Sequence, residues 1–421
     1  MQGKPLSTEI KQCRACGNPL LESVCDLGTM AFSGVFPKTL TQIVPQGPLE
    51  LVKCHGDSTN SCGLVQLRHC FDPQILFGES YGYRSGLNQS MREHLRNLAR
   101  DIENYVELKK NDAVIDIGSN DGTLLNFFAG KDLNLLGIDP ASGKFQQYYH
   151  KEITVIPEFF SAERIKGHLG SQKAKVITAV AVFYDFNNPL EFLKDIASIL
   201  AQEGICLLEQ SYWPTVLENN TYDTICHEHM AYYGLKQIQW LANQAGLKTI
   251  DGQLNSINGG SLRVVLAHKN SAFRQEKSQE EFLIKAEEKL ELEALAPYQR
   301  FQENVFKHRQ ILRQTINDLR SQGLSVAGYG ASTKGNVLLQ FCGLTEKEIP
   351  FIAEINQDKW GCFCPGSGIP IIAQEEAKSR KPDVFLVLPW HFKNFILSKE
   401  KEYLKQGGSF LFPFPQILRQ G

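Results

Sequence analysis

The sequence predicts an α/β protein whose centre is a doubly wound parallel sheet, with a small cysteine-rich module before it and a second, smaller α/β unit after it. Three observations support this fold class. Strand patterns alternate with helical patterns between residues 114 and 209, strand, loop and helix units begin at residues 114 and 324, and six of the eleven cysteines fall within the first 70 residues. The predicted units are a module over residues 1–75, a central domain over 76–270, a helical linker over 271–322 and a C-terminal α/β domain over 323–421.

The composition is ordinary for a globular protein with several domains. The 421 residues are enough for two or three domains, each with its own core. The 44 Lys and Arg residues balance 46 Asp and Glu residues, so no net field favours nucleic acid or an anionic membrane. No apolar run reaches the roughly 18 residues of a membrane span, and the first ten residues lack the apolar core of a signal peptide. Eleven cysteines without a secretion signal indicate reduced thiols and a cytoplasmic protein.

Four of the early cysteines form two pairs that can bind one metal ion. Cys13 and Cys16 are separated by two residues and followed by glycine, an arrangement in which two thiolates bind the same ion. Cys54 and Cys62 are more widely spaced, but the residues between them resemble an inserted surface loop. Four thiolates suit a closed tetrahedral site, so we predict a structural zinc ion at Cys13, Cys16, Cys54 and Cys62. His55 is an alternative fourth ligand, and buried free thiols are the alternative to a metal site.

Residues 114–125 form the first strand, loop and helix unit, with glycine at positions 118 and 122. Glycine has no Cβ, so the backbone can turn sharply and approach a ligand closely, and the start of a helix offers free N–H groups. The next strand pattern ends in Asp139, whose carboxylate can accept both hydroxyls of a ribose. A dinucleotide site would have another glycine where Asn120 stands. The unit therefore indicates a nucleoside ligand without a pyrophosphate, and a ligand-free turn is the alternative.

The run D-x-G-S-N-D-G at residues 116–122 resembles the first motif of class I methyltransferases, whose cofactor is S-adenosylmethionine (SAM). The resemblance implies that the central domain has the class I SAM-methyltransferase sheet, with the loop at the methionine part and the acid after the second strand at the ribose. Fold position places the adenine beside Phe160 and the methyl group beside Ala181, with simple core packing as the alternative for Phe160. The expected SAM contacts are Asp116, Gly118, Asn120, Gly122, Asp139, Phe160 and Ala181.

Residues 81–94 are too polar and aromatic for an ordinary linker. Tyr81, Tyr83 and Ser85 precede a helical pattern that begins near Ser90. This placement, directly before the SAM-type strand, indicates a contribution to the site. A polar cap on an amphipathic helix is the alternative.

His227, Glu228 and His229 lie between the fifth predicted strand and an amphipathic helix pattern at residues 235–245. Histidine is the side chain best suited to move a proton near neutral pH, so these residues are candidate catalytic groups. His227 and His229 are two residues apart and, unlike the histidines of H-E-x-x-H, would not share a helical face as metal ligands. A structural role for either histidine is the alternative.

The order of five motifs resembles the sugar C-methyltransferases over nearly the whole chain. The motifs are the cysteine module, Y-x-Y-x-S-x-x-x-x-S at residues 81–90, D-x-G-S-N-D-G, H-E-H, and G-Y-G-A-S-T-K-G-N at residues 328–336. Such enzymes, similar to the C-3′ methyltransferases of tetronitrose and mycarose biosynthesis, methylate a carbon of a nucleotide-linked 4-keto-6-deoxyhexose. The resemblance implies that His229 is the general base, that Glu228 is the neighbouring acid, and that Tyr81 or Tyr83 lies near the sugar ketone. His227 is a further catalytic candidate, and Cys226 stands where the family often has tyrosine.

The last third of the chain predicts a linker and a second nucleotide-type unit. Residues 275–322 are rich in Glu, Lys, Gln and Leu, which indicates two long solvated helices that bridge domains. The loop at residues 330–336 is not a Walker loop, but N–H groups, two hydroxyls and a lysine at a helix start can bind an anion such as a pyrophosphate. The predicted substrate contacts of this Rossmann-like domain are Tyr329, Ser332, Thr333, Lys334, Asn336 and His391. A nucleotide-free turn is the alternative.

These features together predict a SAM-dependent C-methyltransferase that acts at C-3′ of a nucleotide-linked 4-keto sugar, through proton abstraction by His229 and an enolate. The expected ligands are SAM, a structural zinc ion and a nucleotide sugar such as a dTDP-linked one. We expect no nucleic-acid or membrane partner, and a monomer fits the sequence. An NAD-dependent sugar-nucleotide oxidoreductase or epimerase, and a non-enzymatic zinc-module scaffold, are the alternatives.

Overall fold

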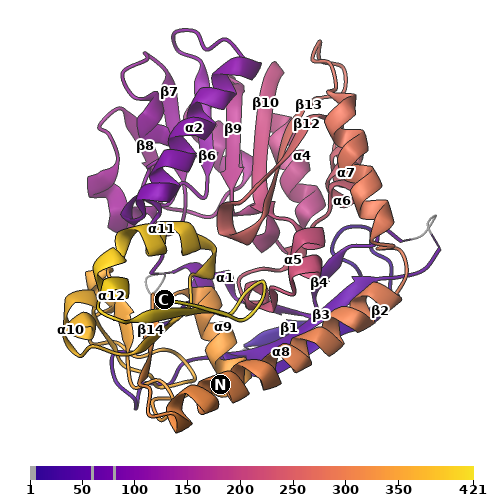
Figure 1. Cartoon of the computed structure of the whole chain (residues 1–421). Helices are drawn as coiled ribbons and strands as arrows, with labels where there is room; N and C mark the ends of the chain where they lie inside the picture. Colours follow the sequence, from indigo (N-terminus) through magenta and orange to yellow (C-terminus); the bar gives the residue numbers. More distant parts are fainter. Residues whose placement is uncertain (1–5, 58–60, 79–81) are drawn as a thin grey trace, which may run out of the picture.

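The computed structural model describes residues 6–57, 61–78 and 82–421. Within this part of the chain the strands form one two-stranded pair and three larger sheets, of four, seven and six strands. Figure 1 shows the seven-stranded sheet above the other two, which lie beside each other. Tyr81, one of the predicted site residues, lies outside the described residues.

The central sheet has the strand order β12-β13-β10-β9-β6-β7-β8. Strands β8, β7, β6, β9 and β10 are parallel, which confirms the predicted doubly wound arrangement. An antiparallel hairpin that the sequence analysis did not predict completes the sheet, because β13 pairs antiparallel with both β10 and β12. The strands are β6 (Ala113–Ile117), β7 (Asn134–Ile138), β8 (Ile153–Ile156), β9 (Ala174–Val180), β10 (Leu200–Ser211), β12 (Leu247–Asn255) and β13 (Ser261–His268).

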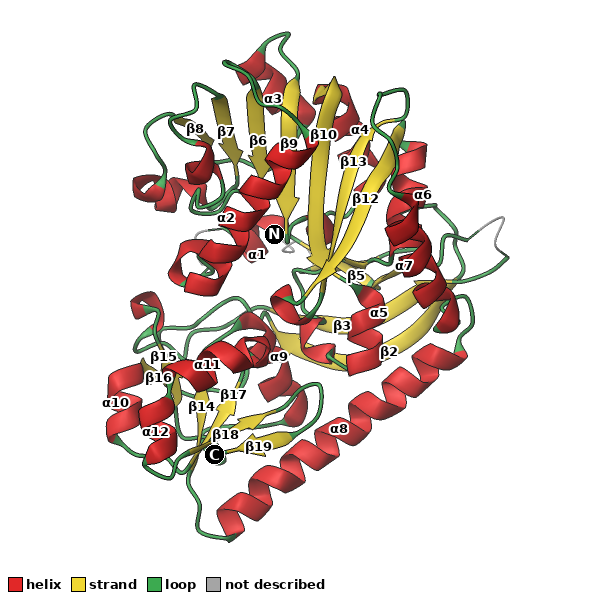
Figure 2. Cartoon of the chain, turned by 45° about the horizontal axis from the view of Figure 1, so that its top comes forward, coloured by secondary structure: helices red, strands yellow, loops and turns green. Residues whose placement is uncertain are grey.

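Helices cover both faces of the central sheet. Helix α2 (Gln89–Tyr105) packs on one face (Figure 2), and α3 (Ala162–Leu169), α4 (Pro189–Ile199) and α6 (Leu235–Gln244) pack on the other. Helix α2 begins where the sequence predicted, because the side chain of Asn88 accepts a hydrogen bond from the backbone N–H of Ser90 at 3.0 Å.

The prediction of a helix directly after Gly122 was wrong. The chain forms only a short 3₁₀ turn, η2 (Leu125–Phe128), before the next strand. The carboxylate of Asp121 accepts hydrogen bonds from the N–H and hydroxyl of Thr123, and such local bonds compete with helix formation. Gly130 and Asp132 then adopt positive φ angles and return the chain to β7. The loop is therefore followed by a short 3₁₀ turn in place of the predicted α-helix.

The N-terminal module is a four-stranded sheet with the order β11-β4-β3-β2. Its outermost strand β11 (Ala231–Tyr232) comes from the centre of the chain and directly follows the H-E-H segment. The other strands are β2 (Leu21–Ala31), β3 (Gln46–Cys54) and β4 (Val65–Leu67). The pair of β1 (Ser7–Glu9) with β5 (His69–Phe71) and the short helix α1 (Pro73–Phe77) complete the module.

Helices α7 (Lys277–Lys289) and α8 (Ala296–Ser321) occupy the predicted linker, but α8 is not a solvated bridge. It buries a stripe that includes Phe301, Val305, Leu312 and Ile316. Figure 2 shows α8 running from the N-terminal sheet to the C-terminal domain, and it contacts β2, α9 and α5 (Trp213–Asn219). Helix α8 therefore joins the two smaller sheets through a shared apolar core.

The C-terminal sheet has the order β16-β15-β14-β17-β18-β19. All of its pairs are parallel except that of β18 with β19, and this order agrees with the predicted Rossmann-like domain. The strands are β14 (Val326–Tyr329), β15 (Ile352–Glu354), β16 (Ile371–Ala373), β17 (Val384–Val387), β18 (Ser409–Phe412) and β19 (Leu418–Gln420). The helices are α9 (Thr333–Cys342), α10 (Gln374–Ser379), α11 (Lys393–Lys399) and α12 (Lys401–Lys405).

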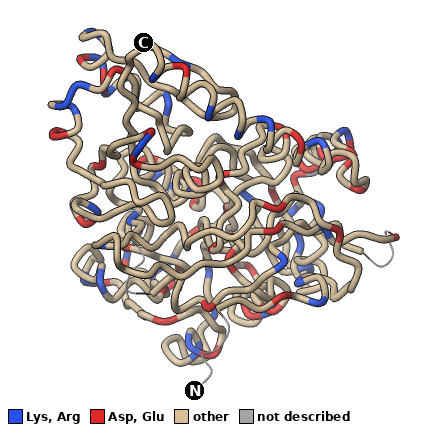
Figure 3. Tube along the Cα trace, turned by 90° about the horizontal axis from the view of Figure 1, so that it is seen from below, with Lys and Arg blue, Asp and Glu red and all other residues tan. Residues whose placement is uncertain are grey.

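Charged residues of both signs are intermixed along the chain when the molecule is seen from below (Figure 3). This distribution agrees with the near-balance of the 44 basic and 46 acidic residues in the sequence. None of the helices in the described ranges is long and apolar enough to cross a membrane.

Candidate functional site

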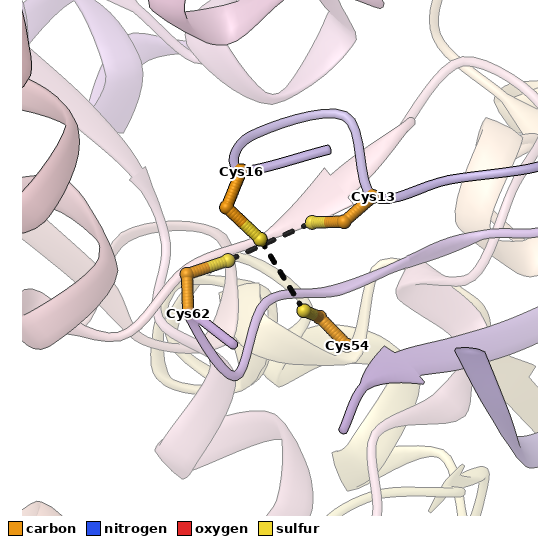
Figure 4. A group of neighbouring side chains, drawn as sticks. All are labelled: Cys13, Cys16, Cys54 and Cys62. Carbon is orange, nitrogen blue, oxygen red and sulfur yellow. Dashed lines mark hydrogen bonds between the residues drawn. The ribbon is translucent and has the colours of Figure 1, made fainter. Parts of the chain in front are cut away.

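The four cysteines predicted as metal ligands come together at one point. Their sulfur atoms all lie within 4.8 Å of one another, with 3.6 Å between those of Cys13 and Cys62 and 3.5 Å between those of Cys16 and Cys54. Figure 4 shows the four side chains directed toward one another, with that of Cys54 coming from the end of β3. A tetrahedral zinc ion with Zn–S bonds of about 2.3 Å requires sulfur atoms about 3.8 Å apart, so the cluster fits zinc. His55 is not part of this cluster.

Amide groups around the cluster orient the sulfur atoms. The side-chain amide of Gln66 donates to the sulfur of Cys13 at 3.2 Å, and that of Asn18 donates to the sulfur of Cys54 at 3.4 Å. Gln66 lies on β4, which pairs with β11, and the N–H of Leu67 donates to the carbonyl of Met230 at 3.0 Å. The cysteine cluster therefore supports the strand that anchors the H-E-H segment.

The loop after β6 and Asp139 after β7 form one hydrogen-bonded unit. The carboxylate of Asp139 accepts the N–H of Asn120 at 3.0 Å and the N–H of Ala141 at 2.6 Å. Gly118 has a φ of +71°, and a Cβ at this position would lie 2.1 Å from Val182 Cγ2, so only glycine fits. Gly122 has a φ of +73°. This unit has the geometry of a nucleoside site at the carboxyl edge of a parallel sheet.

Residues 83–85 contact this loop through hydrogen bonds. In this stretch the sequence analysis predicted a site role only for the tyrosines. The N–H of Ser85 donates to the side-chain oxygen of Asn120 at 2.9 Å, and the side-chain amide of Asn120 donates to the carbonyl of Tyr83 at 3.1 Å. The Arg84 guanidinium lies 3.6 Å from the carboxylate of Asp121 and donates to the hydroxyl of Tyr148 at 2.6 Å. The side chain of Tyr83 is 46% exposed. Arg84 was missed, because its role depends on Asp121 and Tyr148, which are distant in the sequence.

Asp116, Phe160 and Ala181 lie at the same sheet edge in different environments. The carboxylate of Asp116 accepts the hydroxyl of Thr178 at 2.6 Å, and burial raises the pKa of Asp116 to about 7. Phe160 is half-buried and packs edge-on against Phe192, with ring centroids 5.3 Å apart. Ala181 adopts a φ of +56°, an unfavourable conformation for alanine that marks a constrained turn after β9.

The structure fixes the tautomer of His229. Its Nδ1 lies 2.8 Å from the carbonyl oxygen of Thr224, and because a carbonyl oxygen can only accept, Nδ1 carries the proton. Nε2 therefore keeps its lone pair in the neutral ring. The ring of Tyr184 packs 4.1 Å from the ring of His229. Burial and the positive charge of Lys334 lower the pKa of His229 to about 3, so the ring is neutral at physiological pH.

Glu228 and His227 occupy different surroundings. Glu228 is 5% exposed, burial raises its pKa, and one of its oxygens accepts the hydroxyl of Ser33 at 3.4 Å. The other oxygen is buried against Gly34, where a Cβ would lie 2.5 Å from it. His227 is fully buried between the rings of Phe32 and Phe71, and its Nε2 lies 3.0 Å from the carbonyl oxygen of Gly47. The structure thus places His227 in the core of the N-terminal module.

Lys334 extends from the first turn of α9 toward the H-E-H segment. Its ammonium donates to the carbonyl of Asn258 at 3.0 Å and interacts electrostatically with Asp223. The Trp390 indole donates to the Asp223 carboxylate at 2.8 Å. Burial raises the pKa of Asp223 to about 6, and Lys334 opposes this rise. Sequence reasoning missed Asp223 and Asn258, because neither belongs to a recognisable motif.

The other predicted residues of the C-terminal domain are directed to different places. The hydroxyl of Ser332 accepts the N–H of Gly335 at 3.0 Å and so caps its own helix. The side-chain amide of Asn336 donates to the carbonyl of Ser33 at 2.8 Å, and the hydroxyl of Tyr329 donates to Glu400 at 2.9 Å. Thr333 is half-buried in the first turn of α9. Of the residues predicted to bind an anion in this loop, Lys334 therefore extends toward the H-E-H segment, whereas Ser332 and Asn336 bond to other parts of the chain.

His391 lines a hollow of about 550 Å³ that is largely open to solvent, between the C-terminal domain and the central sheet. Its opposite wall is formed by the end of β12 and the turn that leads to β13. Burial and the charge of Lys334 lower the pKa of His391 to about 3.

Comparisons with known proteins cover almost the whole chain. Residues 13–77 match a zinc binding domain family, residues 91–251 match a methyltransferase domain family, and residues 256–415 match the C-methyltransferase C-terminal domain. The C-methyltransferase NovU of Streptomyces niveus is 30% identical over 414 residues, which are 97% of this chain and 96% of that protein.

The chain belongs to the C-methyltransferase family. It is a SAM-dependent C-methyltransferase with an N-terminal zinc-binding cluster of four cysteines. The alternatives of an NAD-dependent oxidoreductase and of a non-enzymatic scaffold are therefore set aside.

Solved structures resemble parts of this C-methyltransferase weakly. Magnesium protoporphyrin IX methyltransferase (ChlM) of Synechocystis PCC 6803 with bound SAH matches with a TM-score of 0.34 and 15% identity over 45% of this chain and 91% of that one. The mitomycin 7-O-methyltransferase MmcR matches with a TM-score of 0.36 and 14% identity over 43% of this chain and 55% of that one. Similarities this weak give no information about the activity of this C-methyltransferase.

We expect the C-methyltransferase to contain about one zinc ion per chain when it is purified without chelator. Cys54→Ser removes one thiolate and should reduce both the zinc content and the unfolding temperature. Cys25→Ser, at a buried cysteine on β2 outside the cluster, is the matched control and should keep its zinc. Elemental analysis and thermal unfolding measure both effects. Less than half an equivalent of zinc in the unmodified protein would remove the site.

Asp139→Asn should raise the Kd for SAM by about 10- to 100-fold. A hydrogen bond to a charged group contributes roughly 1.5–3 kcal/mol, and about 1.4 kcal/mol corresponds to a tenfold change in affinity. Isothermal titration calorimetry measures the change. Asp132→Asn, at an exposed position that already has a positive φ, should bind SAM normally. An unchanged Kd for Asp139→Asn would show that this carboxylate does not hold the ribose.

Proposed function

We propose that this C-methyltransferase methylates C-3′ of a nucleotide-linked 4-keto-6-deoxyhexose. The resemblance to sugar C-methyltransferases supports this substrate class, because it includes motifs from all three sheets. The observation that carries the chemistry is the hydrogen bond from Nδ1 of His229 to the carbonyl of Thr224. It leaves Nε2 unprotonated on a ring that packs against Tyr184, in the turn that follows β9 of the central sheet.

The reaction needs a base because carbon is a poor nucleophile until a proton beside a carbonyl is removed. In the proposed first step Nε2 of His229 takes the C-3′ proton, and the electron pair of the C–H bond moves into the enolate of the C-4′ ketone. In the second step the C-3′ carbon forms a bond to the methyl group of SAM as the sulfur–methyl bond breaks. SAM supplies an electrophilic methyl group on a positively charged sulfur. The proton leaves the His229 imidazolium to solvent after transfer.

Glu228 is the proposed donor to the developing enolate oxygen. Burial raises its pKa, which favours the protonated carboxyl. A neutral carboxyl group in an apolar site can donate such a bond at neutral pH. Tyr83 and Tyr81 remain candidates for a second donor. We assign no catalytic role to His227, because its ring is enclosed by Phe32 and Phe71.

The proposed SAM contacts follow the hydrogen-bonded unit of loop and acid. Asp139 holds the ribose, and Gly118, Asn120 and Gly122 allow the methionine part to approach the backbone. Asp116 supports the loop from β6, while Phe160 and Ala181 lie beside the adenine and the methyl group. This arrangement presents the methyl group to the side of the sheet edge where His229 lies.

His229→Asn should lower turnover on a 4-keto-6-deoxy nucleotide sugar by about 10²- to 10⁴-fold. The asparagine amide can still donate to the carbonyl of Thr224, but it offers no base at the position of Nε2. Deuterium incorporation at C-3′ in heavy water without SAM should be lost to a similar extent, while SAM affinity stays unchanged. His268→Gln, whose amide can replace the contact of Nε2 with Leu200, is the control and should be nearly as active as the unmodified enzyme. Turnover of His229→Asn within threefold of normal would rule out this base.

Lys334→Met should raise the pKa of His229. The positive charge of Lys334 disfavours a second positive charge on the ring, so removing it makes protonation easier. In the unmodified protein the imidazole signal of His229 should stay constant between pH 8 and pH 5, because its pKa is about 3. NMR on protein with labelled histidine measures both, and the His229→Asn variant assigns the signal. A titration near pH 6.5 in the unmodified protein would contradict the burial of a neutral ring.

A further inference from the structure

Arg14 lies between two of the zinc-binding cysteines, and its backbone is part of the cysteine cluster. The N–H of Arg14 donates to the side-chain oxygen of Gln66 at 2.9 Å, and the amide of Gln66 donates to the sulfur of Cys13 at 3.2 Å. The N–H of Gly17 donates to the carbonyl of Cys13 at 2.9 Å and closes the turn that contains Arg14. The backbone of Arg14 is therefore fixed by the same contacts that shape the cluster.

The guanidinium of Arg14 connects the cluster to other parts of the molecule. It donates to the backbone carbonyl of Leu67, at the end of β4, and to that of His69, on β5, the latter at 3.0 Å. It also donates to the side-chain oxygen of Asn187 at 3.4 Å, in the loop that follows η4 (Phe183–Asp185) of the central domain. A planar guanidinium can serve several acceptors at once, whereas a lysine ammonium is a point charge. Arg14 therefore links the N-terminal module to the central domain directly.

A further contact brings Arg14 to the H-E-H segment. One of its nitrogen atoms lies 4.0 Å from the sulfur of Met230, the residue that directly follows His229. Leu67 forms a second link, because its carbonyl accepts from Arg14 while its N–H donates to the carbonyl of Met230 at 3.0 Å. On the other side, the N–H of Met230 donates to the carbonyl of Tyr184, whose ring packs against that of His229. Met230 is buried, so water does not replace these contacts easily.

These contacts matter because proton transfer from carbon requires close geometry. The ring of His229 is attached to a backbone that is held at Met230 from two directions, by the zinc-binding module and by the central domain. A misplacement of about 1 Å that originates away from the chemistry can slow a reaction by on the order of 100-fold. Loss of the Arg14 guanidinium removes the direct link between β4 and the loop after η4. The two supports of Met230 could then shift relative to each other.

We propose that Arg14 is a positioning residue for the methyl transfer, which transmits the shape of the cysteine cluster to the backbone at His229. This inference rests on the proposed function, in which His229 is the base. It adds to that function a contribution of the N-terminal module to the reaction rate as well as to stability. Arg14 acts through Leu67 and Met230 and supplies no zinc ligand.

The first test is Arg14→Met, which removes the guanidinium and keeps an apolar stem. Because the four thiolates are unchanged, this variant should keep about one zinc ion per chain and normal SAM affinity. We expect kcat on a 4-keto-6-deoxy nucleotide sugar to fall at least about tenfold with KM nearly unchanged, since groups that orient a site from outside contribute roughly 10- to 100-fold. Deuterium incorporation at C-3′ without SAM should slow by the same factor. Elemental analysis, calorimetry and steady-state kinetics measure these effects.

Arg68→Met is the matched control. Arg68 belongs to the same module and is half-buried like Arg14, but its guanidinium pairs with Glu50 at 2.8 Å. Both variants should lose some thermal stability. Only Arg14→Met should lower kcat and displace the imidazole signals of His229 in the NMR spectrum of protein with labelled histidine. A purely structural role of Arg14 would not separate the two variants in this way.

Arg14→Lys keeps the test decisive if Arg14→Met does not fold. The lysine retains the positive charge but cannot reach the acceptors on β4, on β5 and in the loop after η4 at the same time. Its kcat should fall about threefold or more with normal zinc content. Ethylguanidinium added to the Lys variant should restore part of the lost kcat, and ethylammonium should restore none.

The outcomes separate this inference from the proposed function. Normal kcat in Arg14→Met, or in Arg14→Lys where Arg14→Met does not fold, overturns the role of Arg14 and leaves substrate and base in place. Loss of zinc from Arg14→Met also overturns it, because Arg14 would then act on the cluster itself. Turnover of His229→Asn within threefold of normal overturns the proposed base, whatever the Arg14 variants show.

Discussion

The hydrogen bond between Nδ1 of His229 and the carbonyl of Thr224 is the interaction on which the proposed chemistry depends. It decides which ring nitrogen is the base, and it holds only if the backbone at residues 222–232 is fixed. Three separate parts of the chain fix that backbone. Strand β11 pairs with β4 of the zinc-bearing module, Asp223 is bonded to Trp390 of the C-terminal domain, and the N–H of Met230 donates to Tyr184 of the central sheet.

The position of this segment explains why three modules occur in one chain. The central sheet positions Asp139 and its loop, whereas the proposed base lies in the H-E-H segment outside that sheet. The H-E-H segment leaves the central sheet to join the N-terminal one, and Lys334 approaches it from the C-terminal domain. Burial lowers the pKa of His229 and raises that of Glu228, so both side chains favour their neutral forms. The packing of the three modules therefore determines the protonation of the proposed base and acid.

Local patterns in the sequence predicted the parts of the site that short-range geometry determines. The glycines at 118 and 122 and the four cysteines could be found because a turn and a metal each require particular residues at particular spacings, while the ribose contact of Asp139 stays a prediction. The sequence could not separate His227 from His229, because their difference arises from Phe32 and Phe71, which are far away in the chain. It also missed β11, the role of Arg84 and the hollow beside His391. Each of these depends on contacts between residues that are far apart in the sequence, and such contacts leave no periodic pattern in it.

The most direct test of the central claim is a crystal structure of the enzyme with S-adenosylhomocysteine and a 4-keto-6-deoxy nucleotide sugar. The proposed mechanism predicts that Nε2 of His229 lies roughly 3–3.5 Å from C-3′ of the sugar, with Nδ1 still bonded to Thr224. It also predicts that C-3′ faces the sulfur atom from the opposite side. A ring of His229 that points away from the sugar, or an Nε2 bonded to another protein group, would contradict it.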